Sequence, residues 1–456
     1  KVSIYTCGVT PYNYCHVGNA RPYLVWDVIR RYLTYKGYSV RYVQNFTDVD
    51  DKIIRRANEE GVSALAIADR YINEYFKDMD ALGIARADVY PRVTDHIPDI
   101  IDMVKRLIDT GHGYVIDGDV YYWVESLPEY GKLSGRSLED LKAGARIDVD
   151  ERKRHPMDFA LWKASKEGEP AWDSPWGLGR PGWHIECSVM ALKYLGPGFD
   201  FHGGGSDLIF PHHENEIAQS EGALGTTFAR YWVHNGFVNM AGEKMAKSVG
   251  NVVRVRDVLE KYPGPALRYY MLSTHYRSPI DFNLDDMPAA QRGWERLRNL
   301  EDNLERTLAG QDTTLPEQLS DDAKKFLTTL EEHRQSFEKS MDADFNTAQA
   351  LGVLFELARD LNSYLAAGGI SGERAAVLAA GRDLFLTLGG ILGLTGVGGG
   401  QQDRALIEGL IQLVAELRQE ARARKDYATA DRVRDRLAEL GIVLEDTASG
   451  PRWQYK

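Results

Sequence analysis

The sequence has few cysteines and no long hydrophobic run. Its 456 residues include only three cysteines, Cys7, Cys15 and Cys187. A set that is both odd and sparse excludes a disulfide scaffold and is typical of reduced thiols inside the cell. No run of 18 or more apolar residues occurs, so we expect no membrane-spanning segment. We therefore expect a cytoplasmic protein whose thiols are available for metal binding or catalysis.

The sequence also lacks an excess of basic residues. Its formal net charge is −12, from 55 Lys and Arg against 67 Asp and Glu. This balance excludes a protein whose whole surface binds nucleic acid, although it allows a local basic patch. The chain is too long for a single core, so we expect about two to four domains.

A thiol and a histidine lie close together near the start of the chain. Residues 2–6 are predicted to form a strand that breaks at Gly8, and a helical pattern begins at Ala20. Cys7 thus lies at the end of a strand, and His16-Val-Gly-Asn19 lies at the start of a helix. Helix N-termini bind phosphate through their free N–H groups. The same pattern also fits a strand–turn–helix unit whose Cys and His have no function.

Apolar spacing predicts an α/β nucleotide-binding domain with an insertion. Residues 20–36 show helical spacing and residues 38–46 a second strand, which together form the strand–helix–strand unit of a parallel sheet. Residues 113–165 carry hairpin and loop signals instead, so we predict an insertion there. In the second half we predict a helix at 183–194, then a short strand that ends in a turn at 203–207.

The last third of the sequence predicts helices, a linker and a small terminal module. Residues 389–400 contain seven glycines and are predicted to be a flexible linker. Charged helices follow, and a hairpin is predicted from Ile442. Within 418–436, seven basic side chains accompany four acidic ones. This stretch fits either a solvated helix surface or a phosphate-contact surface beside Trp453 and Tyr455.

Four side chains could together bind a metal ion: Cys7, Cys187, His212 and Glu216. His212 and Glu216 are four residues apart, so on a helix they share one face. Two thiolates, an imidazole and a carboxylate make an acceptable tetrahedral zinc set. A surface His–Glu pair with two small buried cysteines fits the same residues. His213 and His184 are alternative ligands, although neither has a Glu four residues later.

A lysine-containing segment is the second candidate for phosphate chemistry. Lys244 and Lys247 lie in a polar segment after a predicted strand, and they could neutralise charge on departing pyrophosphate. A lysine-containing segment of this kind is often an exposed loop with no function. Its combination with the turn at His16, more than 200 residues earlier, favours the functional interpretation.

These motifs together resemble the class I aminoacyl-tRNA synthetases, and specifically the cysteinyl-tRNA synthetase family. His16-Val-Gly-Asn19 is similar to the HIGH motif, and Lys244-Met-Ala-Lys247-Ser248 is similar to KMSKS with Ala in third place. Three further segments match cysteinyl enzymes closely: residues 7–10, 182–187 and 210–216. The resemblance covers nearly the whole chain.

The resemblance implies the residues of each site. One zinc ion per chain would be bound by Cys7, Cys187, His212 and Glu216. ATP would be bound by His16, Gly18, Asn19, Lys244, Lys247 and Ser248, of which His16, Asn19 and the two lysines would act in catalysis. The substrate cysteine would contact Gly8, Thr10, Trp183 and Asp207, with Asp207 near the ammonium group. Cys15 is expected to be structural.

The resemblance also implies the reaction and the partners. L-cysteine would be activated with ATP, accompanied by Mg²⁺, and transferred to the 3′ end of tRNA-Cys, with a zinc–thiolate contact selecting cysteine over serine. We expect a monomer with no membrane partner. Two alternatives share the motifs. One is a mycothiol cysteine ligase with an amino-sugar acceptor, and the other is a non-catalytic, zinc-dependent RNA-binding protein derived from a synthetase.

The expected fold class is α/β. It comprises a Rossmann-like parallel-sheet catalytic domain with an inserted connective subdomain, an α-helical bundle and a small mixed C-terminal module. The expected boundaries are 1–112 and 166–240 for the two catalytic halves, 113–165 for the insertion, 241–300 for the KMSKS loop and stem-contact region, 301–388 for the anticodon-binding bundle, 389–402 for the linker and 403–456 for the anticodon-recognition module.

Overall fold

The computed structural model resolves into two compact units, Lys1–Gly396 and Val397–Lys456. It describes residues 1–140, 151–240, 242–245, 250–396, 402–424, 426–439, 442–447 and 450–455.

A parallel sheet forms the centre of the first unit. Its strands lie in the order β2 (Val40–Gln44), β1 (Val2–Thr6), β7 (Phe199–Gly205) and β8 (Ala229–Asn235). β1 pairs in parallel with β2 on one side and β7 on the other. The strand order therefore reverses between β1 and β7, and α/β folds bind ligands at the carboxyl ends of such strands. The predicted α/β class is confirmed.

Helix α1 (Val17–Tyr35) connects β1 to β2 and begins three residues before the predicted start. The His16 side chain accepts a hydrogen bond from the Asn19 N–H at 3.2 Å, and the Asn19 side chain accepts from the His16 N–H at 3.4 Å. This reciprocal capping box sets the helix start. Leu24 and Val28, one helical turn apart, are both buried against the core.

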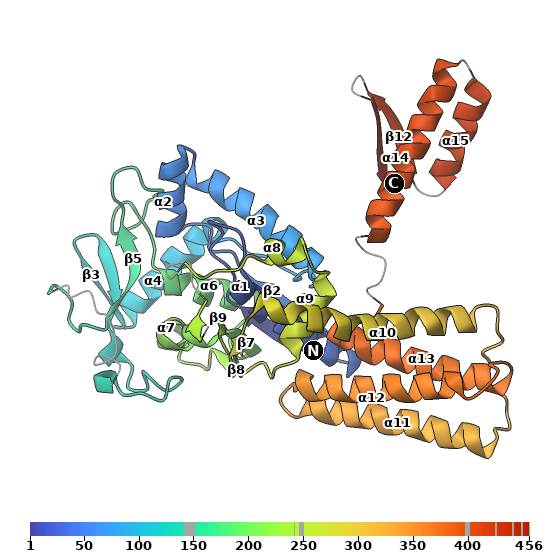
Figure 1. Ribbon diagram of the computed structural model, residues 1–456. Coiled ribbons are helices and arrows are strands. Elements are labelled where there is room, and N and C mark those ends of the chain that lie inside the picture. The colour runs from blue at the N-terminus through green and yellow to red at the C-terminus, as the bar shows by residue number, and fades with distance from the viewer. Residues whose placement is uncertain are drawn as a thin grey trace. The chain divides into compact units, whose positions relative to one another are not determined.

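The other helices of the catalytic region flank this sheet (Figure 1). They are α2 (Asp51–Glu60), α3 (Ala64–Ala81), α4 (Ile97–Asp109), α6 (Trp183–Leu195), α7 (Glu214–Leu224), α8 (Val255–Leu259) and α9 (Gly264–Leu272). A small sheet after β8 has the order β10 (Glu243–Lys244), β9 (Val238–Met240) and β11 (Ile280–Asp281).

The insertion is an antiparallel sheet that extends further than the sequence predicts. Its strands are β3 (Gly113–Ile116), β4 (Asp119–Tyr122), β5 (Phe159–Ala164) and β6 (Gly179–Pro181), in that order. Because β6 pairs with β5, the insertion ends near Pro181 and not at residue 165. The short β6 carries no alternating pattern to reveal it. A Cβ on Gly182 would lie 1.9 Å from the Ala160 carbonyl oxygen, so glycine permits the close approach.

The predicted turn at residues 203–207 is also corrected. β7 continues to Gly205, and a short 3₁₀ helix covers Ser206–Leu208. A Cβ on Gly203 would lie 2.1 Å from Trp26 Cζ2. Gly203 therefore allows α1 to pack closely on the strand, a role that composition cannot distinguish from a turn.

Helices α10 (Met287–Leu308), α11 (Asp321–Asp342), α12 (Thr347–Ala366) and α13 (Glu373–Leu392) form a bundle (Figure 1). By length and composition alone α13 could cross a membrane, although the sequence contains no run of 18 or more apolar residues. Most of its apolar window is buried, and it packs against α1, α10, α11 and α12. A core helix meets the same criterion, and the packing of α13 accounts for its hydropathy.

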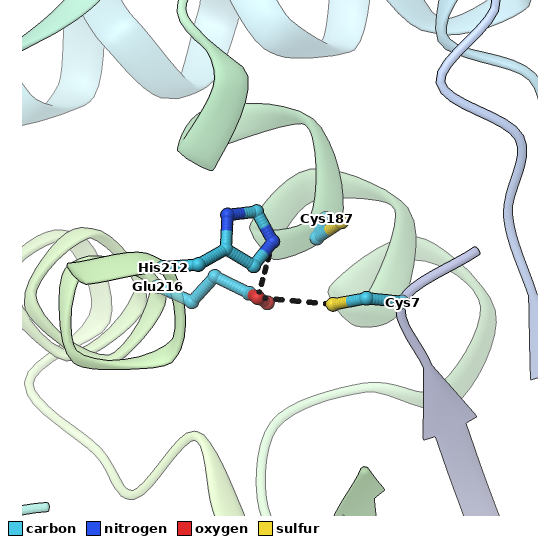
Figure 2. Close-up of side chains that lie close together, drawn as sticks. All are labelled: Cys7, Cys187, His212 and Glu216. Atoms are coloured by element: carbon cyan, nitrogen blue, oxygen red, sulfur yellow. Dashed lines mark hydrogen bonds and ion pairs between the residues drawn. The ribbon is translucent and has the colours of Figure 1, made fainter. Parts of the chain in front are cut away.

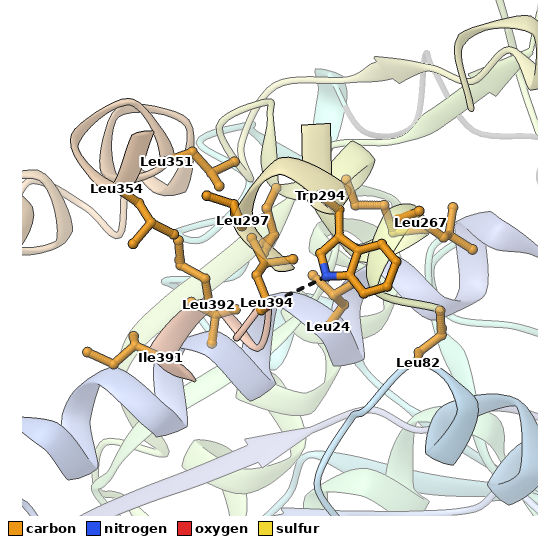
Figure 3. Close-up of a cluster of buried hydrophobic side chains, with 14 of the residues drawn as sticks. Leu24, Leu82, Leu267, Trp294, Leu297, Leu351, Leu354, Ile391, Leu392 and Leu394 are labelled. Carbon is orange, nitrogen blue, oxygen red and sulfur yellow. Dashed lines mark hydrogen bonds between the residues drawn. The ribbon is translucent and has the colours of Figure 1, made fainter. Parts of the chain in front are cut away.

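The glycine-rich linker begins later than predicted. α13 continues to Leu392, and Leu394 is 1% exposed in the cluster that joins the bundle to the catalytic region (Figure 3). Trp294 Nε1 donates to the Leu394 carbonyl oxygen at 3.2 Å. A Cβ on Gly389 would lie 2.3 Å from Thr395 Oγ1, so this glycine serves close packing and not flexibility.

Arg268 of α9 links α1 to the end of the bundle through a buried ion pair and a hydrogen bond. Arg268 is fully buried; its Nη2 contacts Asp27 Oδ2 at 2.5 Å and its Nε donates to the Leu392 carbonyl oxygen. The Asp27 carboxylate also accepts from Arg31 and from the Ala85 N–H. Although burial opposes ionisation, these neighbours hold the pKa of Asp27 below its usual value. The helix that begins at His16 is thus fixed to the end of α13.

The described residues of the second unit form two helices and the predicted hairpin. These elements are α14 (Gln402–Ala423), α15 (Tyr427–Glu439), β12 (Ile442–Thr447) and β13 (Gly450–Tyr455), with the strands antiparallel. Arg418 is 6% exposed, and Arg434 pairs with Asp431 and Asp435. The basic surface is thus smaller than the sequence predicts. Lys425 and the side chains of the two C-terminal aromatic residues lie outside the described part.

We predict that Asp27→Asn lowers the free energy of unfolding by about 3–5 kcal/mol, because it leaves the buried Arg268 guanidinium without a counter-charge. Chemical denaturation measures this change. The matched control is Asp99→Asn, which breaks an exposed pair with Lys193 and should cost less than about 1 kcal/mol. Equal costs for both variants would contradict the assignment.

Candidate functional site

The candidate site lies at the carboxyl ends of β1 and β7. Cys7 directly follows β1, and its N–H donates to the Gly203 carbonyl oxygen of β7 at 3.3 Å. α6 and α7 pack beside these strand ends. The site therefore occupies the point where strand order reverses, which is where this fold class binds ligands.

The four predicted metal ligands converge at this point. Cys7, Cys187, His212 and Glu216 are all buried, and one ligand atom of each lies within 4.8 Å of the others. Figure 2 shows them pointing toward one another from the end of β1, from α6 and from the start of α7. Glu216 Oε1 lies 3.4 Å from Cys7 Sγ and 3.0 Å from His212 Nε2. Ligand atoms of a tetrahedral zinc site are separated by roughly 3.3–3.8 Å, so the donor set fits a metal ion.

His212 does not lie within α7 as the four-residue spacing suggests. It belongs to an irregular helical turn, Ile209–His213, that directly precedes α7. The backbone at Phe210 is non-helical, yet the next residues resume a helical path. His212 and Glu216 therefore still face the same side, and the prediction that they meet is confirmed.

A second group of side chains shares two of these ligands. Cys7, His202, His213 and Glu216 also lie within 4.8 Å of one another. However, His202 Nε2 lies 2.8 Å from Glu216 Oε2, the oxygen turned away from His212, and His213 Nδ1 lies 2.8 Å from His234 Nε2. These contacts are typical of residues that orient a ligand. His184 supports His212 in the same way, with 2.9 Å between their Nδ1 atoms.

Charge at the site is arranged to attract a cation. Burial opposes ionisation of Glu216, but His202 and His212 outweigh it and lower its pKa to about 2. A hydrogen bond with Cys7 lowers the pKa of Cys187, whereas burial raises that of Cys7. Burial disfavours the charged form of His212, but Glu216 and Cys187 raise its pKa to about 10. A bound metal ion would therefore displace a proton from His212.

Asn45 joins two of the ligand segments, a role that the sequence did not reveal. Its Oδ1 accepts from the Gly8 N–H at 2.8 Å and lies 3.7 Å from Cys187 Sγ. A Cβ on Gly8 would lie 1.5 Å from the Asn45 carbonyl oxygen. Gly8 is thus required for backbone packing beside the metal ligands. Asn45 and His202 carried no motif, and only their contacts distinguish them, whereas His184 and His213 were expected as alternative ligands.

The residues predicted to line the amino-acid pocket differ in their exposure, and Trp183 lies against the metal cluster. The Trp183 ring centroid lies 4.4 Å from that of His212, and Trp183 is 43% exposed. It therefore forms an open apolar wall beside the cluster. Thr10 is partly buried, and Asp207 is exposed in the 3₁₀ helix after β7.

The predicted nucleotide residues lie at the start of α1 and after β9. His16 is 9% exposed, and its Nδ1 accepts from Asn19 N–H. The proton of the neutral ring is therefore on Nε2, which can donate to a phosphate oxygen. A Cβ on Gly18 would lie 3.0 Å from His16 Nδ1, so a larger residue would crowd the ring. The Lys244 backbone lies in β10; its side chain, Lys247 and Ser248 lie outside the described part.

The fold and the family models that match this chain define the class of protein. Residues 1–292 match the catalytic domain of class I (C) tRNA synthetases and residues 336–396 match the DALR domain. The Mycobacterium tuberculosis methionyl-tRNA synthetase, in complex with methionyl-adenylate, superposes with a TM-score of 0.63 at 18% identity, over 86% of this chain and 89% of that one. A ternary complex of the Agrobacterium radiobacter K84 LeuRS with tRNA and LeuAMS gives 0.64 at 13% identity, over 87% and 85%. The chain has the fold and catalytic domain of a class I aminoacyl-tRNA synthetase.

Relatives with higher sequence identity identify the family within this class of synthetases. Residues 415–455 match the cysteinyl-tRNA ligase anticodon binding domain. Cysteine–tRNA ligases of Pelotomaculum thermopropionicum and Moorella thermoacetica are each 56% identical, over 100% of this chain and 95% of the relative. That of Desulforamulus reducens is 54% identical over 99% and 95%. The chain belongs to the cysteine–tRNA ligase family.

We predict that Cys187→Ser lowers metal content to less than about one tenth of wild type under chelator competition, because a hydroxyl replaces a thiolate ligand. His213→Gln is the matched control, since it changes a neighbouring buried side chain that belongs only to the second group; it should retain most of the metal. Elemental analysis of the purified variants measures both. The reverse pattern would show that the second group binds the ion.

Proposed function

We propose that this protein activates L-cysteine with MgATP to cysteinyl-adenylate and then transfers the cysteine to the 3′ end of tRNA-Cys. The observation that carries the proposal is the buried donor set of Cys7, Cys187, His212 and Glu216, in a chain that matches cysteine–tRNA ligases over its full length. All assigned residues lie in one chain, so we propose an active monomer. We also propose a cytoplasmic location, where its three free cysteines would stay reduced.

We propose that the metal is zinc. Two thiolates, one imidazole and one carboxylate suit zinc better than magnesium or calcium, which prefer oxygen ligands. Bound zinc would select cysteine because it binds a thiolate far more tightly than a serine hydroxyl. The chain would hold this ion through its four ligands, with His184 and His202 fixing the orientation of His212 and Glu216.

The remaining residues would position the two substrates for reaction. His16 Nε2 would donate to an ATP phosphate, held in place by the capping hydrogen bond to Asn19. Trp183 would enclose the cysteine side chain, and Thr10 and Asp207 would bind its polar groups, with Asp207 near the ammonium. The cysteine carboxylate would then attack the α-phosphate. Lys244 and Lys247 would stabilise the charge of the departing pyrophosphate.

The alternatives are weaker. A mycothiol cysteine ligase shares the metal-binding core but needs no anticodon module, whereas residues 415–455 match such a module. A non-catalytic RNA-binding protein needs neither the capped turn at His16 nor the lysines of the KMSKS-like segment. Charging of tRNA-Cys and cysteine-dependent pyrophosphate exchange distinguish all three.

We predict that the protein supports ATP–pyrophosphate exchange with cysteine, and that serine supports it about 10⁴-fold less well in kcat/KM. Isotope exchange with each amino acid measures this ratio. Exchange that is absent with cysteine, or equal with serine, would contradict the proposed activity.

We further predict that removal of residues 397–456 leaves cysteine-dependent exchange within about twofold of the full chain but lowers tRNA charging at least about tenfold. The second unit is compact by itself, and the exchange residues all lie in the first. Parallel exchange and charging assays measure both effects. Equal loss of both activities would mean that the second unit serves folding.

A further inference from the structure

The segment that follows the lysines pairs with the segment that contains His16. We call residues 244–248 the lysine loop and residues 15–19 the His16 turn. The Val17 N–H donates to the Val253 carbonyl oxygen at 2.9 Å, and the Val255 N–H donates to the Cys15 carbonyl oxygen at 3.0 Å. His16 itself forms an antiparallel bridge with Arg254. Residues 253–255, which follow the lysine loop in the chain, are therefore attached to the His16 turn through the backbone.

The next residue, Arg256, is held by two carboxylates of α3. Its Nη1 lies 2.7 Å from Glu74 Oε2, and its Nη2 lies 3.0 Å from Asp78 Oδ1. The Arg256 guanidinium also lies 3.8 Å from the ring centroid of Tyr14. Charge-assisted hydrogen bonds combined with stacking fix a guanidinium in both position and plane. We call this set of three residues around Arg256 the α3 clamp: Tyr14, Glu74 and Asp78.

Asp78 contacts both paired segments. Its side chain is 4% exposed, and it hydrogen-bonds to the backbone of Cys15 as well as to Arg256. Burial raises the pKa of Asp78 to about 6, against the charge of Arg256, so the guanidinium helps to keep this carboxylate ionised at neutral pH. The Tyr14 ring packs edge-on against the Tyr71 ring of α3, with 5.4 Å between the ring centroids. The clamp thus joins α3, the residues before His16 and the residues after the lysine loop.

We propose that Arg256, held by the α3 clamp, is a positioning residue for amino-acid activation. It fixes residues 253–256 against the His16 turn, so that the chain leaves the lysine loop from a fixed anchor beside His16. The inference rests on the proposed function, because it assigns both segments to ATP. Arg256 acts through the segments it fixes and needs no contact with the substrates.

The clamp lies on elements other than those of the metal cluster. The cluster is built from β1, α6 and α7, whereas the clamp joins α3 to residues 14–17 and 253–256. Loss of Arg256 should therefore weaken the use of ATP without altering cysteine recognition. A residue that served stability alone would reduce the amount of active protein and affect both substrates equally.

The experiment is steady-state ATP–pyrophosphate exchange with Arg256→Met, which keeps the stem of the side chain but removes its charge. We expect kcat/KM for ATP to fall on the order of tenfold, with KM for cysteine and metal content within about twofold of wild type. Arg256→Lys should recover part of the loss, because it restores the charge to Glu74 and Asp78 but not the planar stacking on Tyr14.

The matched control is Arg70→Met, which removes another ion-paired arginine, one that joins α3 to Glu60 of α2. It should leave every exchange parameter within about twofold of wild type. The double variant Arg256→Met with Glu74→Gln should be no worse than Arg256→Met, because the two residues act as a pair. If the wild type shows no cysteine-dependent exchange, the proposed function fails. Where the wild type shows exchange, Arg256→Met could keep wild-type kinetic parameters, or be impaired equally for ATP and for cysteine. Either result overturns only the role of Arg256.

Discussion

The Glu216 carboxylate is completely buried, and the site depends on the groups that keep it ionised. An isolated carboxylate in such a place would be strongly disfavoured. Glu216 avoids this cost through contacts on both oxygens, with His212 on one side and His202 on the other. Because these residues come from β7, α7 and the turn before it, the carboxylate determines where those elements meet. Cys7 and Cys187 complete a donor set suited to a cation.

The segment that leads from Cys7 to the His16 turn is short, and it contributes residues both to the metal cluster and to the predicted nucleotide site. β1 ends at Thr6, Cys7 joins the metal cluster, and ten residues later the His16 turn opens α1. In the proposed function, the metal cluster would read the amino-acid side chain and the His16 turn would bind the nucleotide, so recognition and activation would share one stretch of backbone. Asp27 and Arg268 then fix α1 to the end of the bundle. The segment from Cys7 through α1 is therefore fixed at one end by the metal cluster and at the other by its contacts with the bundle.

Much of this site could be predicted from the sequence, but its support could not. The four-residue spacing of His212 and Glu216 and the strand that precedes Cys7 indicate ligands through local periodicity, which a sequence records directly. His202 and Asn45 act through contacts with residues far along the chain, and no local pattern marks them. Glycine was the most misleading residue type. Gly203 and Gly389 suggested a turn and a linker, yet each permits a close approach between packed elements.

We infer that the buried cluster binds an ion that takes the substrate sulfur. X-ray absorption at the metal edge tests this inference most directly, because it counts the sulfur atoms bound to the ion. We expect two sulfur ligands in the protein alone, from Cys7 and Cys187, and a third when cysteine is added but not when serine is added. A sulfur count that cysteine leaves unchanged, or a count below two without substrate, would contradict it.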